Sequence, residues 1–254
     1  MTLVFIFLYV IFGILGLVII LFALGRHTFW LPIRDRKLPR LVMLHQVTPH
    51  ELPSGMNMPP ERFERLLQIL QKQGRTFVTM SELVSHPMTP YQVALTFDDG
   101  FADNYHYAFP LLKKYQAKAT IYLAPDIPVI DKLQHSQILE MAESGLIEFG
   151  AHSVNHVNLT KLDDTQAIQE IEQSRDAVQR IVGSCRSFAY PYGRFDERHE
   201  KMVEAAGFTS AVSTRKKIEP ISSANIFRLP RVSTHGKMSA VQMRIALARG
   251  RYRI

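Results

Sequence analysis

Cysteine is nearly absent from this sequence, in which Cys185 is the single cysteine among 254 residues. One cysteine excludes an intramolecular disulfide framework and a cysteine-rich zinc finger, so histidines and carboxylates must hold any bound metal. Internal repeats and low-complexity segments are absent as well, and 46% of the residues are hydrophobic. This composition excludes a disordered protein, and the length suffices for a sizeable core.

Charged side chains are missing from residues 1–25, and residues 3–24 are almost wholly apolar. As a helix, this stretch is about 33 Å long, which is enough to cross a bilayer core of about 30 Å. A cleavable signal peptide normally has basic residues before a shorter apolar core and small residues at the cleavage site. The sequence does not follow that pattern, so we predict that residues 1–25 form an uncleaved transmembrane anchor.

The net charge of +7 is concentrated in two short segments. Residues 26–40 carry +4 and residues 237–254 carry +5, which leaves −2 for the rest of the chain. We predict a basic juxtamembrane linker over 26–40, interrupted by Pro32 and Pro39, and a basic C-terminal segment over 237–254. Such segments are attracted to anionic lipid headgroups, although a solvated tail is an equal alternative for the second one.

The position of the basic residues also predicts the topology. Because they follow the apolar span, the positive-inside rule favours a single-pass protein of the inner (cell) membrane with its body in the cytoplasm. The membrane is therefore a predicted partner, whereas no motif in the sequence points to nucleic acid.

Beyond residue 40, short apolar runs alternate with stretches of helical periodicity. The helical pattern is clearest over 163–182, where Ile168, Ile171 and Val178 fall on one face. Strands separated by such helices imply parallel pairing, and we predict an α/β fold, a distorted (β/α) barrel, over residues 41–236. The predicted strands are 41–44, 76–79, 91–97, 119–123, 146–150, 187–190 and 208–212.

Polar side chains capable of chemistry stand at the ends of these strands: the pairs Asp98–Asp99 and His152–His156, and His45. In a parallel barrel the strand ends meet at one face, so these groups are predicted to converge on one pocket. The i, i+4 spacing of the two histidines predicts that one helical turn puts both rings on the same side. Two imidazoles and one carboxylate are a common zinc set, although either motif alone is more often a surface pair or a capping turn.

Three short motifs go beyond this generic chemistry: TFDDG at 96–100, HSVNH at 152–156 and FAYPYG at 188–193. In this order they resemble the signature motifs of the polysaccharide deacetylase family (NodB-like, carbohydrate esterase family 4). The resemblance covers residues 38–235, and the FAYPYG form is similar to the branch of poly-N-acetylglucosamine deacetylases. The family fold is a distorted (β/α) barrel, in agreement with the alternation of strands and helices.

The resemblance implies a role for each motif residue. Asp98 is implied as the general base, and Asp99, His152 and His156 as the metal ligands. The backbone N–H of Tyr192 is implied as a donor to the oxyanion of the reaction. Zinc is the first choice for this ligand set, and Co²⁺, Ni²⁺ and Mn²⁺ also fit it.

One departure from the family pattern concerns the group that orients the base. The third motif of the family commonly has an arginine two residues before its proline, but Ala189 stands at that position here. Arg228 and Arg231 are the candidates to replace it.

A second departure concerns the general acid. The usual C-terminal histidine of the family corresponds to His235, which lacks the expected apolar strand before it. In contrast, LVMLH at 41–45 resembles the N-terminal strand of the circularly permuted branch, in which the histidine is the general acid. We therefore expect His45 rather than His235 in this role; the alternative is a strand-end histidine with a structural role.

Together these residues predict a membrane-anchored, metal-dependent hydrolase that removes acetyl groups from the N-acetylated sugars of a polysaccharide or lipid-linked glycan. Two alternatives stay open. An O-acetyl esterase acting on glycans would use the same groups, and the loss of the arginine at Ala189 is compatible with a catalytically degenerate, membrane-tethered glycan-binding barrel.

Overall fold

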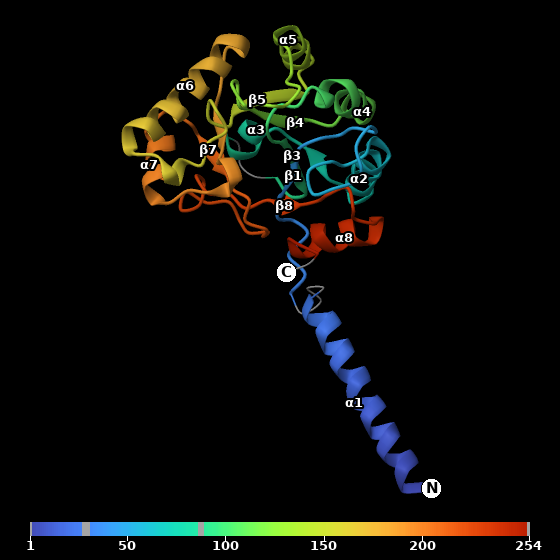
Figure 1. Ribbon diagram of the computed structural model, residues 1–254. Helices are drawn as coiled ribbons and strands as arrows, with labels where there is room; N and C mark the ends of the chain where they lie inside the picture. Colours follow the sequence, from blue (N-terminus) through green and yellow to red (C-terminus); the bar gives the residue numbers. More distant parts are fainter. Residues whose placement is uncertain (1, 27–30, 86–88, 253–254) are drawn as a thin grey trace.

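The computed structural model of the chain describes residues 2–26, 31–85 and 89–252. At its centre, eight parallel strands form one sheet in the order β7-β6-β5-β4-β3-β1-β8, with β2 beside β3 (Figure 1). The strands are β1 (Arg40–Leu44), β2 (Thr76–Phe77), β3 (Gln92–Phe97), β4 (Ala119–Leu123), β5 (Ile147–Ala151), β6 (Ser187–Ala189), β7 (Ser210–Val212) and β8 (Val232–Ser233).

Most helices of the body lie around the outside of this sheet (Figure 1). The apolar residues of the first one, α2, recur every three or four positions, and Phe63, Leu66, Leu67 and Leu70 are all buried against the strands. The helices are α2 (Pro60–Lys72), α3 (Met80–Ser85), α4 (Phe109–Tyr115), α5 (His135–Glu143), α6 (Asp164–Val182), α7 (Glu197–Ala205) and α8 (Ala240–Arg249), with short helical turns at Asn104–Ala108, Leu159–Lys161 and Pro191–Gly193.

One segment closes the sheet into a barrel. Val232 and Ser233 of β8 pair with β1, and Leu229, just before β8, forms a bridge to Val212 of β7. Residues 229–233 therefore join the two ends of the strand order. The predicted distorted (β/α) barrel is confirmed, and it is irregular because β8 contributes only two residues.

The helix α1 (Thr2–Arg26) stands apart from the barrel (Figure 1). Its stretch Val4–Ala23 has a mean hydropathy of 3.1 and is not buried against the rest of the chain. The helix is long and apolar enough to cross a membrane, and a signal sequence near an N-terminus has the same properties.

The C-terminal part of the chain differs from the expectation of a separate basic segment. Residues 240–249 form α8, which contacts α2 and buries Met243, Ala246 and Leu247. These three apolar residues have helical spacing, but the five basic residues of 237–254, with no acidic residue among them, favour the prediction of a separate basic segment. A solvated tail is therefore excluded for 240–249.

The predicted linker over 26–40 also ends inside the body of the protein. Residues 27–30 of this linker lie outside the described residues, as do Met1 of the predicted anchor and residues 253–254. At the other end of the linker, Arg40 is the first residue of β1 and is 1% exposed. The barrel therefore begins one residue earlier than predicted, with a buried charged side chain at its amino end that donates to α8.

Replacing Leu247 with alanine tests whether α8 belongs to the folded core. Leu247 is buried, whereas Val241 on the same helix is 62% exposed. We expect Leu247→Ala to lower the free energy of unfolding by about 2–5 kcal/mol, because it leaves a cavity in the core. The matched control Val241→Ala is expected to change it by less than about 0.5 kcal/mol. Urea unfolding followed by circular dichroism measures both values, and equally small effects would contradict the packing of α8.

Candidate active site

The side chains predicted to carry chemistry lie at the same end of the sheet. His45 follows β1, Asp98 and Asp99 follow β3, His152 follows β5 and Tyr192 follows β6. The closest nitrogen and oxygen atoms of His45 and Asp98 are 3.8 Å apart, and those of His152 and Asp99 are 3.5 Å apart. The structure therefore brings these strand ends together, as a parallel barrel requires.

Asp99, His152 and His156 direct three possible ligand atoms toward one point. Asp99 Oδ1 lies 3.5 Å from His152 Nε2 and 3.2 Å from His156 Nε2, and the three atoms are all within 4.8 Å of one another. Ligand atoms bound to a tetrahedral divalent ion are about 3.3–3.4 Å apart, so this spacing fits a metal. Among the described residues no hydrogen bond of good geometry reaches the buried Asp99 Oδ1, and the contact with His156 Nε2 is the nearest to one; a bound cation would satisfy this oxygen.

The two histidine rings, whose centroids are 4.8 Å apart, approach each other through a loop. The chain from 152 to 158 contains no helix, and it turns at Ser153 and His156, whose φ values are positive. The carboxylate of Glu170 in α6 accepts two backbone N–H groups of this loop, at 2.9 and 3.0 Å. The prediction of a helical turn is therefore wrong, because left-handed residues and a distant carboxylate bring the rings together instead.

A backbone carbonyl orients His152. Its Nδ1 lies 2.6 Å from the Ala189 oxygen, so Nδ1–H donates to that oxygen and Nε2 keeps its lone pair toward Asp99. Burial lowers the pKa of His152, although the neighbouring carboxylates act in the opposite direction. The neutral ring is the form that binds a metal. A strand neighbour, β6, therefore sets the tautomer needed for a ligand.

Asp98 faces a different partner from Asp99. Arg231 donates to both carboxylate oxygens of Asp98 at 2.7 Å, and the two side chains are almost completely buried. The guanidinium is held in turn by Thr96 Oγ1 at 3.0 Å and by the Ser213 carbonyl at 2.9 Å. Burial acts to raise the pKa of Asp98, but the charge and hydrogen bonds of Arg231 outweigh it and hold that pKa well below its usual range.

Of the two candidates for the missing arginine, Arg231 is the one that contacts the carboxylate. Arg228 instead lies 3.4 Å from Glu200 of α7, with 38% of its side chain exposed. The methyl group of Ala189 is too short to reach Asp98. Arg231 supplies that contact from the segment that closes the barrel.

His45 and His235 follow neighbouring strands but have different surroundings. His45 Nε2 lies 3.8 Å from Asp98 Oδ2, and the Asn104 side chain fixes this end of β1 by donating to the His45 carbonyl at 2.9 Å. His235 lines a cavity with several cationic side chains between β8 and α8. The described contacts therefore associate His45 with the carboxylate.

Backbone strain is concentrated around this pocket. Asp99, Ser153, His156 and Tyr192 have φ values between +52° and +77°, a region that residues with a Cβ rarely adopt. Such positions cost free energy and persist where surrounding contacts hold them, which is typical of functional sites. The Tyr192 ring also lies against His156, with 4.5 Å between centroids, and 59% of Tyr192 is exposed at the rim.

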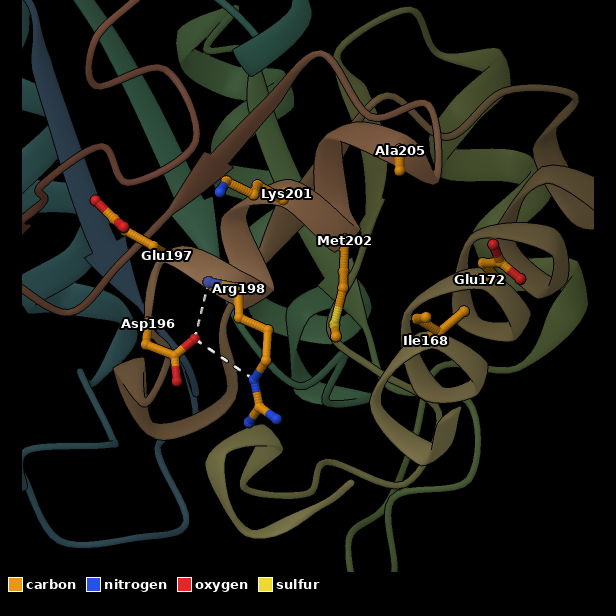
Figure 2. Close-up of a pocket in the computed structure, with 8 residues that line it drawn as sticks. All are labelled: Ile168, Glu172, Asp196, Glu197, Arg198, Lys201, Met202 and Ala205. Carbon is orange, nitrogen blue, oxygen red and sulfur yellow. Dashed lines mark hydrogen bonds and ion pairs between the residues drawn. The ribbon is translucent and has the colours of Figure 1, made fainter. Parts of the chain in front are cut away.

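A wide hollow between α6 and α7 is a different feature (Figure 2). Ile168, Met202 and Ala205 form its apolar part, and Arg198 pairs with Asp196 at its edge. None of the predicted site residues lines this hollow, and it lies outside the barrel rather than at the strand ends. It is therefore not the candidate active site.

Several contacts that shape the site have no signal in the sequence. Ala189 and Ser213 act through backbone carbonyls, which every residue carries. Glu170 is one of several acids on α6, and its spacing to the HSVNH motif does not distinguish it. Thr96 is the exception, because it belongs to the TFDDG motif and a polar residue inside a buried strand is itself a signal.

The family model for polysaccharide deacetylases matches residues 85–211, which is half of the chain. The matched region contains the aspartates, the histidines and the tyrosine of the three motifs. The chain belongs to the polysaccharide deacetylase family. His45 and Arg231 lie outside the matched residues, so their place in the pocket comes from the fold of this chain.

Two curated relatives agree with this assignment. YxkH of Bacillus subtilis is 31% identical over 188 residues, which are 71% of this chain and 66% of YxkH. The poly-beta-1,6-N-acetyl-D-glucosamine N-deacetylase of Staphylococcus epidermidis is 26% identical over 191 residues, which are 68% of this chain and 66% of that protein. This chain therefore spans just under two thirds of the length of these relatives.

Solved structures share the fold. The Streptococcus pyogenes deacetylase PplD, solved in complex with acetate, has a TM-score of 0.75 at 24% identity, over 84% of this chain and 99% of PplD. IcaB from Ammonifex degensii has a TM-score of 0.71 at 23% identity, over 84% of this chain and 97% of IcaB. The irregular parallel barrel of this chain is thus the fold of these proteins.

Replacing each candidate arginine with methionine tests the buried ion pair. Arg231→Met leaves the Asp98 charge buried without a partner, and we expect it to lower the free energy of unfolding by about 3–5 kcal/mol at neutral pH. Arg228→Met removes a partly exposed ion pair, so we expect a change of at most about 1 kcal/mol.

The pH dependence of the two variants provides a further check on the pair. The pair holds the pKa of Asp98 below its unfolded value of about 3.9, so its stabilisation is present above that pH and is lost as the pH falls. The loss in free energy of unfolding caused by Arg231→Met should therefore be smaller at acid pH than at neutral pH, as measured by urea unfolding. A deficit that is the same at pH 3 and pH 7 would contradict the charge interaction.

Proposed function

We propose that this chain removes acetyl groups from the N-acetylated sugars of a glycan, with a divalent metal held by Asp99, His152 and His156. The observation that carries the proposal is one pocket that combines three possible ligand atoms with a second carboxylate, Asp98, which Arg231 keeps charged. Amide hydrolysis needs a base for water, donors for the oxyanion and an acid for the leaving amine. This pocket has a candidate group for each.

The proposed metal is zinc, with Co²⁺, Ni²⁺ and Mn²⁺ as further ions that a His₂Asp set accepts. When bound, such an ion supplies Lewis acidity, which polarises a carbonyl group and acidifies water. The chain contributes the arrangement: His152 is oriented by a backbone carbonyl, and His156 by a loop that Glu170 holds.

Asp98 is proposed as the base that takes a proton from the attacking water. Its pKa is held low by Arg231, so it is unprotonated at neutral pH, and each carboxylate oxygen retains a further acceptor position beside the arginine. His45, 3.8 Å from Asp98 Oδ2, is proposed to give a proton to the departing amine. The Tyr192 N–H is proposed as a donor to the oxyanion, a contact worth about 3–4 kcal/mol in comparable sites.

The proposed substrate class is an N-acetylated polysaccharide or a lipid-linked glycan. The Staphylococcus epidermidis relative is by name a deacetylase of poly-beta-1,6-N-acetyl-D-glucosamine, which supports an N-acetylglucosamine polymer for this chain. We further propose that α1 is an uncleaved single-pass anchor. The positive-inside rule then puts the barrel on the cytoplasmic side of the inner membrane.

Two other functions would use the same pocket. An O-acetyl esterase has a leaving alcohol that depends less on a protonated acid, so a histidine beside Asp98 favours amide cleavage. A catalytically degenerate binding barrel is suggested by the alanine at 189. Arg231 restores the contact that this alanine lacks, which weakens that alternative.

Substituting the two adjacent aspartates separates the proposed roles. We expect Asp99→Ala to lose bound metal, because it removes a ligand atom, and Asp98→Asn to keep metal but lose at least about 100-fold in acetate release, because an amide is not a base. Metal content by mass spectrometry and acetate release from an N-acetylglucosamine oligomer measure the two effects.

The control for this pair is Asp164→Asn, an exposed aspartate on α6 that should leave both readings unchanged. Full turnover in Asp98→Asn would contradict its role as the base. Acetate release from O-acetyl but not N-acetyl sugars would indicate the esterase instead, and bound metal without acetate release from either would indicate the binding barrel.

The pH–rate profile tests the proposed acid. A protonated His45 is required for departure of the amine, so activity should fall on the alkaline side as it loses its proton. We expect His45→Ala to lower the rate by about 100-fold or more and to abolish this alkaline limb. His235→Ala, the matched control, should keep the limb; the reverse result would assign the role to His235.

A further inference from the structure

The two basic segments at opposite ends of the chain meet in the fold. The Arg34 N–H donates to the Ala248 carbonyl at 2.9 Å, and Arg40 Nε donates to the Leu247 carbonyl at 2.6 Å. The end of α8 therefore lies directly against the segment that follows α1 (Figure 1). Charges that are more than 200 residues apart in the sequence become neighbours.

These segments enclose a cavity of about 400 Å³ whose charged lining is entirely positive. Arg36, Lys72 and Arg244 are exposed at its rim, and no aspartate or glutamate lines it. The cations that line it are Arg34, Arg36, Arg40, Lys72, Arg75 and Arg244.

Two of these arginines, Arg40 and Arg75, are only 1% and 7% exposed. The hydrogen bonds of both guanidinium groups go to backbone carbonyls, and both donate to the Leu38 oxygen. Among the described residues, no carboxylate lies within ion-pair distance of either group, and Arg75 Nε is buried without a partner. The one acid of the 26–40 segment, Asp35, is exposed and accepts the N–H of Lys37.

Two buried positive charges that make no direct ion pair are costly for a fold, although Asp35 lies near enough to stabilise the charge of Arg40. Burial and the neighbouring Arg75 lower the pKa of Arg40 to about 10, with Asp35 acting in the opposite direction, so Arg40 remains charged at neutral pH. Burial lowers the pKa of Arg75 as well. A guanidinium presents several N–H groups in one plane, which suits the oxygens of a phosphate group. The cavity thus has the charge, the donors and the room for an anion.

We propose that this cavity binds the phosphate of an anionic phospholipid headgroup. A lipid phosphate is favoured over other phosphates because the cavity lies close to α1. Residue 31, at the start of the segment that lines it, is at most about 18 Å of extended chain from the end of α1. This choice of ligand rests on the proposed membrane span of α1, whereas the anion site itself does not. The exposed rim cations would contact the headgroup phosphate, and the buried charges of Arg40 and Arg75 would add to the positive potential of the cavity.

The cavity lies at the opposite end of the barrel from the candidate active site. Arg40 is the first residue of β1 and Arg75 precedes β2, whereas His45 follows the last residue of β1. Five strand residues separate the two ends by about 16 Å. Binding to the bilayer through this cavity would turn the active site away from the lipid surface, which favours a polymer in solution over a sugar at the headgroup level.

Lipid titration of the full chain tests the proposal. The chain in neutral detergent is titrated with phosphatidylglycerol, phosphatidylcholine or inorganic phosphate, and bound ligand is counted by native mass spectrometry. We expect tighter binding of phosphatidylglycerol than of phosphatidylcholine. In Arg36→Gln/Arg244→Gln this preference should fall about 30-fold, because two rim cations are removed. Arg40 and Arg75 are not substituted, because both are buried and their loss would also destabilise the fold.

The matched control is Arg180→Gln/Lys201→Gln, which removes two exposed cations from α6 and α7 and should keep the preference. Equal binding of both lipids, or a preference that survives in the rim variant, would overturn the proposal. Inorganic phosphate that binds more tightly than phosphatidylglycerol would overturn the lipid assignment. Acetate release should be unchanged in the rim variant, which separates this proposal from the proposed deacetylase function. Alkaline extraction of membranes tests separately whether α1 spans the membrane.

Discussion

A buried guanidinium holds the barrel and its pocket together. Arg231 lies in the segment that closes the strand order, and it donates to Asp98 after β3, to Thr96 within β3 and to the Ser213 carbonyl after β7. One side chain therefore joins β3, β7 and β8 at the place where the barrel is least regular. Because either partner would be costly to bury alone, the fold and the pocket depend on the same ion pair.

The ion pair also separates the chemistry of two adjacent carboxylates. Two aspartates side by side would repel each other unless each had a cation of its own. Asp98 has the guanidinium, and Asp99, at a positive φ, turns toward His152 and His156, where a metal would balance its charge. The positive φ at Asp99 is thus what allows the two adjacent aspartates to face different partners.

The two ends of the barrel differ in charge. At the carboxyl ends of the strands, acids and imidazoles gather around Asp99. At the amino ends, arginines from β1, from the segment before β2 and from α8 gather around one cavity. Because parallel strands all point the same way, their carboxyl ends gather at one end of the barrel and their amino ends at the other, which keeps the candidate active site apart from the basic cavity. The net charge of the whole chain conceals this separation.

Local patterns in the sequence determined the strands β1 to β7, the helices between them, the apolar span and the motif residues, because periodicity and residue identity are properties of neighbouring positions. The two-residue strand β8 and the helix α8 were not predicted. The parallel barrel followed from the same alternation. Only the tertiary structure decided that Arg231 rather than Arg228 reaches Asp98, and that α8 belongs to the core. It also decided that a loop held by Glu170, instead of a helical turn, brings His152 and His156 together. Such contacts join residues far apart in the chain, and a distant partner leaves no periodic trace in either segment.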